Sequence, residues 1–181
     1  HYQQGWGVPK DDAEAVKWYR EAADQGFMLA QTNLGVMYAQ GHGVPKDDDE
    51  AAKWYRKAAD QGDAVAQDNL GDMYASGRGV PKDDTKAAEW YGKAADQGRA
   101  EAQNSLGALY TEGRGVPKND AEAVKWFQKA AEQGYSVAQF NLGLFYMRGQ
   151  GVPPNYAEAV KWLQRAAQQG VKEAQSALQT L

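Results

Sequence analysis

The chain has 181 residues, of which 43% are hydrophobic, 11% aromatic and 24% charged; this is too polar for a membrane protein and too aromatic for a disordered one. A formal net charge of -4 excludes the basic footprint of a nonspecific nucleic-acid-binding protein. Cysteine is absent, which excludes disulfide bonds, thiolate zinc sites and thiol nucleophiles, and no apolar run reaches the roughly 18 residues of a membrane span.

A repeat of 36 residues organises the chain. The tripeptide Gly-Val-Pro returns at this spacing, and residues 7–26 and 43–62 agree at 17 of 20 positions. We predict one array of four full repeats between two half repeats, and because the first residues match the inside of a repeat, we expect the chain to start within an array. The full repeats are 27–62, 63–98, 99–134 and 135–170, and the half repeats are 1–26 and 171–181.

The first helix of each repeat is predicted from helical spacing, for example from Ala64 to Ser76. Leu70 and Tyr74 belong to its expected buried face, and Leu70→Ala is predicted to cost about 2–5 kcal/mol. Gly71 lowers helix propensity but returns in every full repeat, so we interpret it as the point where two helices cross closely.

The second helix follows a Gly-Val-Pro link and is predicted to start with a capping box, as in Asp47 and Glu50. Asp83 with Lys86 lacks the Glu and is expected to cap less well. The second helices also carry a recurring tryptophan, which we expect to span adjacent repeats because it is the largest shared side chain. These tryptophans are Trp18, Trp54, Trp90, Trp126 and Trp162.

The pattern AxxxLGxxYxxGxGVPKDxxxAxxWxxxAAxxG resembles the Sel1-like repeat, a relative of the tetratricopeptide repeat, over essentially the whole chain. The resemblance implies an all-α, right-handed α-solenoid of antiparallel helix pairs, with the first helices lining the concave face. It further implies a bacterial adaptor protein, with a periplasmic or secreted location favoured. One branch of this family has a disulfide bond in each repeat and is associated with penicillin binding. Because this chain has no cysteine, we do not expect the properties of that branch to apply to it.

A partner-binding site is expected where exposed residues differ between repeats, because shared residues build the scaffold. Helical geometry places a variable stripe on the first helices opposite Leu34, and it includes Thr32. In the second full repeat it carries an acidic pair that would favour a basic peptide. The predicted contact residues on and beside this stripe are Asn33, Val36, Asp68, Asn69, Asp72, Asn104, Phe140, Asn141, Leu144 and Met147.

Two features of this stripe admit two explanations each. Phe140, Leu144 and Met147 form an apolar strip that either anchors a partner or packs within the molecule. The recurring Asn33, Asn69 and Asn141 either bind a peptide backbone or make structural hydrogen bonds.

Catalysis and cofactors are not expected. The four serines include no S-x-x-K motif, and the acidic run from Asp47 to Glu50 is explained by helix capping rather than by metal binding. The main hypothesis is therefore a protein or peptide ligand. The alternative is a glycan or peptidoglycan ligand stacked on aromatic residues such as Phe27, Tyr135 and Tyr156. The uncovered apolar residues Ala174, Leu178 and Leu181 predict end-to-end self-association.

Overall fold

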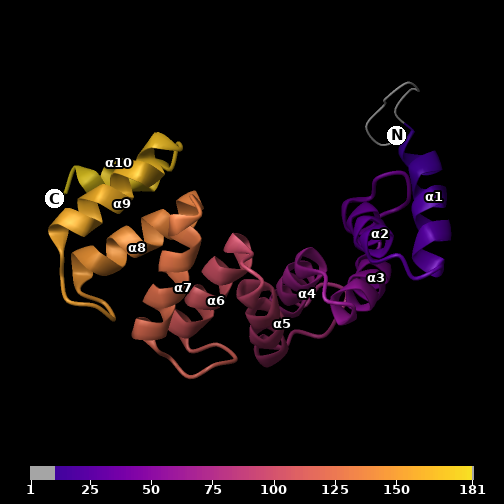
Figure 1. The fold of residues 1–181 in the computed structure, drawn as a ribbon, viewed down its shortest axis with the longest axis horizontal. Helices are drawn as coiled ribbons and strands as arrows, with labels where there is room; N and C mark the ends of the chain where they lie inside the picture. Colours follow the sequence, from indigo (N-terminus) through magenta and orange to yellow (C-terminus); the bar gives the residue numbers. More distant parts are fainter. Residues whose placement is uncertain (1–10, 181) are drawn as a thin grey trace. The chain divides into compact units, whose positions relative to one another are not determined.

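The computed structural model describes residues 11–180, and within that range it consists of ten α-helices without a strand (Figure 1). This confirms the predicted all-α class. The helices are α1 (Asp12–Asp24), α2 (Met28–Gln40), α3 (Asp48–Asp60), α4 (Ala64–Ser76), α5 (Asp84–Asp96), α6 (Ala100–Glu112), α7 (Asp120–Glu132), α8 (Ser136–Arg148), α9 (Tyr156–Gln168) and α10 (Lys172–Leu178).

The chain divides into two compact units, and the boundary falls within α5. In unit 1, His1–Trp90, α2 packs between α1 and α3, and α4 packs against α3 and touches α2. In unit 2, Tyr91–Leu181, the packing runs in chain order from α6 through α7, α8 and α9 to α10. Consecutive helices therefore pack as the pairs of an α-solenoid, as predicted.

The second helices begin with the predicted side-chain cap. Asp47 Oδ1 accepts a hydrogen bond from the Glu50 amide at 2.9 Å. In a complete capping box the Glu50 side chain would accept a hydrogen bond from the Asp47 amide. Here the Asp47 amide donates to the Tyr38 carbonyl instead, at 3.0 Å. Glu50 pairs with Lys53 instead. The link thus docks onto the end of the preceding helix, which fixes where the second helix starts.

Asp83 caps α5 in the same way, so the expectation that it caps less well is wrong in geometry. Its Oδ1 accepts from the Lys86 amide at 3.0 Å, and its Oδ2 lies 3.3 Å from Lys86 Nζ. The hydrogen bond from the Lys86 amide, with that side chain's charge, holds the pKa of Asp83 below its ordinary value. Lysine at the third helical position supports the cap instead of weakening it.

The glycine within each first helix marks a close helix crossing, as predicted. A Cβ on Gly35 would lie 2.6 Å from the Tyr55 ring of α3, and one on Gly143 would lie 2.7 Å from Leu163 Cγ of α9. Both distances are too short for a side chain. The adjacent leucines Leu70 and Leu142 are each 0% exposed, which confirms the predicted core.

The tryptophans of the second helices differ in burial: Trp54, Trp90 and Trp162 are buried, whereas Trp126 is half-buried. Trp162 of α9 belongs to a core cluster with Phe127 and Phe145, so it does connect adjacent repeats. Trp54 is buried as well, but Trp18 is 54% exposed, so the prediction is wrong there. Trp18 lies on α1, the first helix of the described residues, and no earlier pair in that range covers it.

A buried glutamine joins the helices of each repeat. Gln31 Nε2 donates to the Ala23 carbonyl of α1 at 3.1 Å, and Gln31 Oε1 accepts from Gln61 Nε2 at 2.7 Å. This one side chain thereby connects α1, α2 and the end of α3. Both its nitrogen and its oxygen have a hydrogen-bond partner, as buried polar groups require. Gln139, with Ala131 and Gln169, repeats this arrangement in unit 2.

Candidate functional site

In the C-terminal half of each first helix, three positions remain open to solvent and vary along the array. We call these positions the first-helix surface. They are fully or partly exposed in all four of these helices. In unit 1 they are Val36, Ala39 and Gln40 of α2 with Asp72, Ala75 and Ser76 of α4, and in unit 2 they are Ala108, Thr111 and Glu112 of α6 with Leu144, Met147 and Arg148 of α8.

The prediction of the stripe is wrong at one position of the repeat, which Thr32 and Asp68 occupy and which was expected to be exposed. Asp68 is 5% exposed, and Thr32 is equally buried. In unit 2 the same position belongs to Asn104, which accepts a hydrogen bond from Asn141 Nδ2 of the next first helix at 3.0 Å. Neighbouring first helices therefore cover this position, which the geometry of a single helix cannot reveal. The expected acidic pair is wrong, because only Asp72 is exposed.

The recurring asparagines have different environments. Asn141 and Asn104 bond to one another, which supports the structural explanation at this pair. Asn33 is exposed on α2. Asn69 is half-buried and lines a pocket on α4. A role in ligand contact stays a prediction for Asn33 and Asn69.

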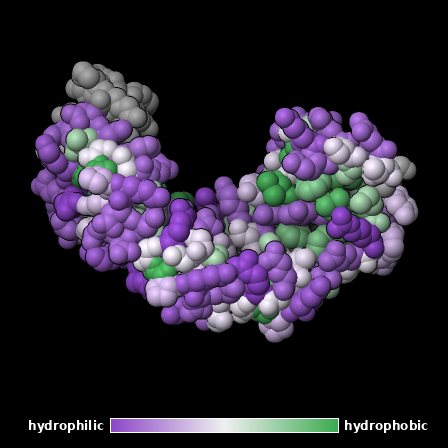
Figure 2. All heavy atoms as spheres, turned by 180° about the vertical axis from the view of Figure 1, so that it is seen from behind, coloured by the Kyte–Doolittle hydropathy of each residue, from purple (hydrophilic) through white to green (hydrophobic). Residues whose placement is uncertain are grey.

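The apolar strip of α8 is partly used inside the molecule. Phe140 and Leu144 are half-buried and pack against the cluster of Leu163, Ala166 and Ala174. This supports internal packing for these two side chains. Figure 2 shows hydrophobic residues gathered on the part of the surface formed by the C-terminal helices, to the right in that view. The partly exposed Met147 is therefore the member of the strip best suited to probe binding.

A polar pocket opens onto the first-helix surface of unit 1. It holds about 180 Å³, far above the roughly 10–15 Å³ that a single water needs. We call it the Asp72 pocket. Its lining residues are Ala39, Gln40, Asp48, Tyr55, Asn69, Asp72, Met73 and Arg78.

The Asp72 pocket combines predicted and unpredicted residues. Asn69 and Asp72 were predicted contacts, and the structure brings them together. The sequence analysis did not predict three other lining residues, because they lie at a helix start, on a core face and in a link; they are Asp48, Tyr55 and Arg78. Arg78 carried a usable signal, since its link position is occupied by a different residue, His42, in the preceding repeat.

The charges of the Asp72 pocket act on Tyr55. Burial raises the pKa of the Tyr55 hydroxyl well above its ordinary value, and Asp72 and Asp48 raise it further, while Arg78 opposes them. Tyr55 is therefore neutral at physiological pH and offers both a donor and an acceptor. Asp48 Oδ2 also lies 3.6 Å from Lys46 Nζ, an ion pair of modest strength because both side chains are partly exposed.

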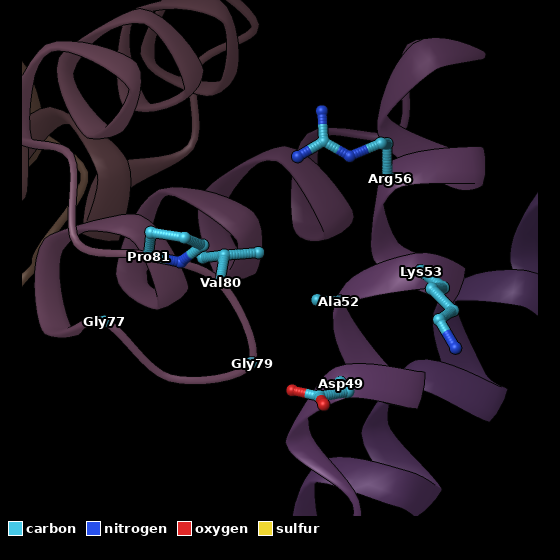
Figure 3. Close-up of a pocket in the computed structure, with 8 residues that line it drawn as sticks. All are labelled: Asp49, Ala52, Lys53, Arg56, Gly77, Gly79, Val80 and Pro81. Atoms are coloured by element: carbon cyan, nitrogen blue, oxygen red, sulfur yellow. The ribbon is translucent and has the colours of Figure 1, made fainter.

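Two larger grooves lie along the second helices of unit 1. One holds about 610 Å³ between α3 and the link from Gly77 to Pro81, and Figure 3 shows Asp49, Lys53 and Arg56 bordering it. The other, of about 620 Å³, lies at the equivalent place beside α1. Arg56 is already engaged, because it donates to the Tyr74 hydroxyl. The link and the basic residues Lys17/Lys53 and Arg20/Arg56 recur in both places, so the groove follows from repeat packing, although Asp49 and Ala52 of one groove correspond to Ala13 and Val16 of the other.

Metal and membrane features can be assessed for residues 11–180. In this range no three acidic or histidine side chains are placed to hold a metal ion. Within the same residues, every helix is too short or too polar to cross a bilayer.

The aromatic residues expected to stack on a glycan are not gathered in one place. Tyr135 packs against the core cluster of α7 and α8. Phe27 and Tyr156 are exposed, but they lie in different units. A glycan ligand stays a prediction without a described site.

The C-terminal helix α10 is incompletely covered. Ala174 is buried against α9, whereas Leu178 is half-buried, and Leu181 lies outside the described residues. Self-association through this end stays a prediction.

Comparison with known proteins finds similarity to repeat proteins from bacteria. The model of the Sel1 repeat matches residues 1–27, 29–63, 64–98, 100–135 and 136–171. A search of curated proteins gives no significant match.

Solved structures give strong matches. A protective antigen of uropathogenic Escherichia coli with an SLR fold shares 44% identity and a TM-score of 0.93, over 96% of this chain and 37% of its own. A Sel1 repeat protein from Oxalobacter formigenes shares 43% identity and a TM-score of 0.89, over 96% and 71%. An immunity protein from Pseudomonas aeruginosa shares 26% identity and a TM-score of 0.60, over 96% and 66%. The chain thus spans little more than a third of the E. coli antigen.

Proposed function

Because this chain belongs to the Sel1 repeat family, we propose that it is a non-enzymatic scaffold that binds a protein or peptide through the first-helix surface. Proteins built from Sel1 repeats generally mediate interactions between proteins and generally lack catalytic activity. The scaffold residues are the same in each repeat, so selectivity for one partner requires residues that differ and can be touched.

The observation that carries the proposal is the coincidence of variation and exposure. Leu34 and its equivalents are identical and buried. Two residues later on the same helices, one position holds Val36, Asp72, Ala108 and Leu144, all accessible. The first helices therefore carry both apolar and acidic side chains at this position. Such a surface can both anchor a bound peptide and fix its direction, which a uniform surface could not do.

The test starts from binders of known sequence. Random displayed peptides are selected on the immobilised full chain, and their affinities are measured by fluorescence anisotropy with Asp72→Lys and Met147→Asp. We expect one or both changes to weaken the selected peptides by about tenfold, the effect of losing one charge-assisted or anchoring contact of about 1.4 kcal/mol. Phe140 and Leu144 are poor choices, because changing them also disturbs the packing against α9 and α10.

Matched controls lie on the second helices of the same units. Asp60→Lys on α3 and Gln164→Asp on α9 alter exposed residues with similar changes of charge. Peptides that respond only to these controls, or to none of the four variants, would overturn the proposed surface. Saturable binding of muropeptides in the absence of any peptide binder would favour the glycan alternative and count against a peptide scaffold.

A further inference from the structure

We propose that the Asp72 pocket binds the guanidinium group of an arginine side chain that the partner peptide presents, an inference that rests on the proposed function. The pocket lies in unit 1 between α2, α3, α4 and the link that follows α4. Ala39, Gln40 and Asp72 of its lining belong to the first-helix surface. A side chain arriving from a peptide on that surface therefore reaches the pocket directly.

The charge of the lining selects a cation. Asp48 and Asp72 contribute two carboxylates, and Arg78 contributes the one positive charge among the lining residues. Lys46 lies outside the lining and is 3.6 Å from Asp48, so it offsets that carboxylate only partly. An anion would meet two carboxylates at close range, whereas a cation meets a surplus of negative charge.

The remaining polar groups favour a guanidinium over a compact ammonium. The side-chain oxygens of Asn69 and Gln40 and the neutral hydroxyl of Tyr55 add acceptors from three different elements, α4, α2 and α3. A guanidinium carries five N–H donors in a plane and is weakly hydrated, so it can serve acceptors on several sides of a small pocket. Ala39 and Met73 supply apolar walls for the methylene stem.

The equivalent positions of unit 2 keep an aspartate, Asp120, and an asparagine, Asn141, but three other lining residues change their chemistry. Tyr55 corresponds to Phe127, Asp72 to Leu144, and Arg78 to Gln150. At these three positions the same backbone thus presents a hydroxyl, a carboxylate and a guanidinium in unit 1, but two apolar side chains and an amide in unit 2. The grooves along the second helices differ from the Asp72 pocket in this respect, because repeat packing forms them at two equivalent places of unit 1.

The direct test uses NMR on the ¹⁵N-labelled full chain with N-acetyl-L-arginine methylamide as the probe. We expect saturable shifts at the Asn69 side-chain amide and the surrounding α4 amides. N-acetyl-L-citrulline methylamide has nearly the same shape without the charge, and it should bind at least tenfold more weakly. The pocket is overturned if the citrulline probe binds equally, or if the arginine probe produces no saturable shift at Asn69.

Two substitutions in the pocket and one control outside it sharpen the test. Asp72→Asn should weaken the arginine probe about tenfold, while Asp60→Asn, an exposed carboxylate of α3 outside the pocket, should leave it unchanged. Arg78→Gln removes the competing cation, so it should tighten binding severalfold. Loss of binding on Arg78→Gln, or equal effects of Asp60→Asn and Asp72→Asn, would contradict the proposal. Thermal unfolding of each variant controls for the fold.

Peptides selected for the proposed function distinguish the two failures. If they respond to the first-helix-surface variants but not to Asp72→Asn or to replacement of their arginines by citrulline, the pocket assignment fails while the scaffold function holds. If none responds to the first-helix surface, the scaffold function fails, whatever the probe does.

Discussion

Unit 1 and unit 2 place the same helix pairs in the same packing but present different chemistry. Around α2, α3 and α4 the open positions include Asp72 and Arg78, which border a polar pocket. Around α8 and α9, Leu144 occupies the position of Asp72 and packs partly against an apolar cluster. The difference shows that the repeat fixes the backbone while single accessible substitutions decide what each part can bind.

The units also differ at a position that faces the neighbouring first helix. In unit 2, Asn104 pairs with Asn141, and one repeat later Phe140 packs on the cluster around Ala174. Variation at this position therefore reflects matched contacts inside the array. Variable residues in a repeat protein divide into those that adapt one repeat to the next and those that face a partner.

The largest expected effect tests whether equivalent core leucines contribute equally to the stability of the two units. Leu70→Ala and Leu142→Ala each remove a fully buried side chain and should each cost about 2–5 kcal/mol in denaturant unfolding. Leu29→Ala, at an exposed position of α2, is the control and should cost less than about 0.5 kcal/mol. A loss below about 1 kcal/mol at either core leucine would break the equivalence of the units.

The next effect tests the close helix crossings. Gly35→Ala and Gly143→Ala would bring a Cβ within 2.6 and 2.7 Å of side chains on the partner helices, so each should destabilise by about 1–3 kcal/mol. Gly92→Ala in α5 is the matched control, since a Cβ there meets nothing within 4 Å. It should stabilise by up to about 1 kcal/mol through helix propensity. Stabilisation by all three changes, measured by thermal unfolding, would rule out tight crossings.

A smaller effect separates structural from exposed asparagines. Asn141→Ala leaves the half-buried Asn104 without its donor and should cost about 0.5–1.5 kcal/mol. Asn33→Ala changes the same register at an exposed site of unit 1 and should cost less than about 0.5 kcal/mol. Equal losses in chemical denaturation would show that the asparagine has the same structural role in both units.

The smallest effect concerns acid and the helix caps. The lowered pKa of Asp83 means that its stabilisation is present above the ordinary aspartate pKa and is lost as pH falls through the lowered value. Helix α7 of unit 2 begins instead with Asn119, whose amide does not titrate in this range. Between pH 5 and 2, hydrogen exchange should accelerate at the Lys86 amide more than at the Glu122 amide, after correction for intrinsic rates. Asp83→Asn should remove the difference.

Much of the fold was predictable because the repeat presents its helical pattern several times. The first helix from Ala64 to Ser76, the cap at Asp47 and the crossing glycines were all predicted from spacing and residue type. The errors arose where a contact came from another helix. Asp68 looks exposed on an isolated helix but is buried by packing, and Trp18 looks buried by analogy with its equivalents but is exposed.

The candidate site was only half predictable. The predicted stripe identified Asp72 through its variation, and Asn69 as a recurring residue at the border of that stripe. Asp48 starts a helix, Tyr55 lies on a core face and Arg78 lies in a link. Nothing in their spacing places them around one cavity. Only the packing of α3 against α2 and α4, together with the link that follows α4, does so.

The sequence by itself determined the repeat, the helices and the buried set, because these depend on local periodicity, capping and the burial of apolar side chains. The tertiary structure decided which variable side chains remain accessible and which charged groups share a pocket. Those properties depend on contacts between helices that are far apart in the chain, and a side chain's own helix does not encode what its neighbours cover.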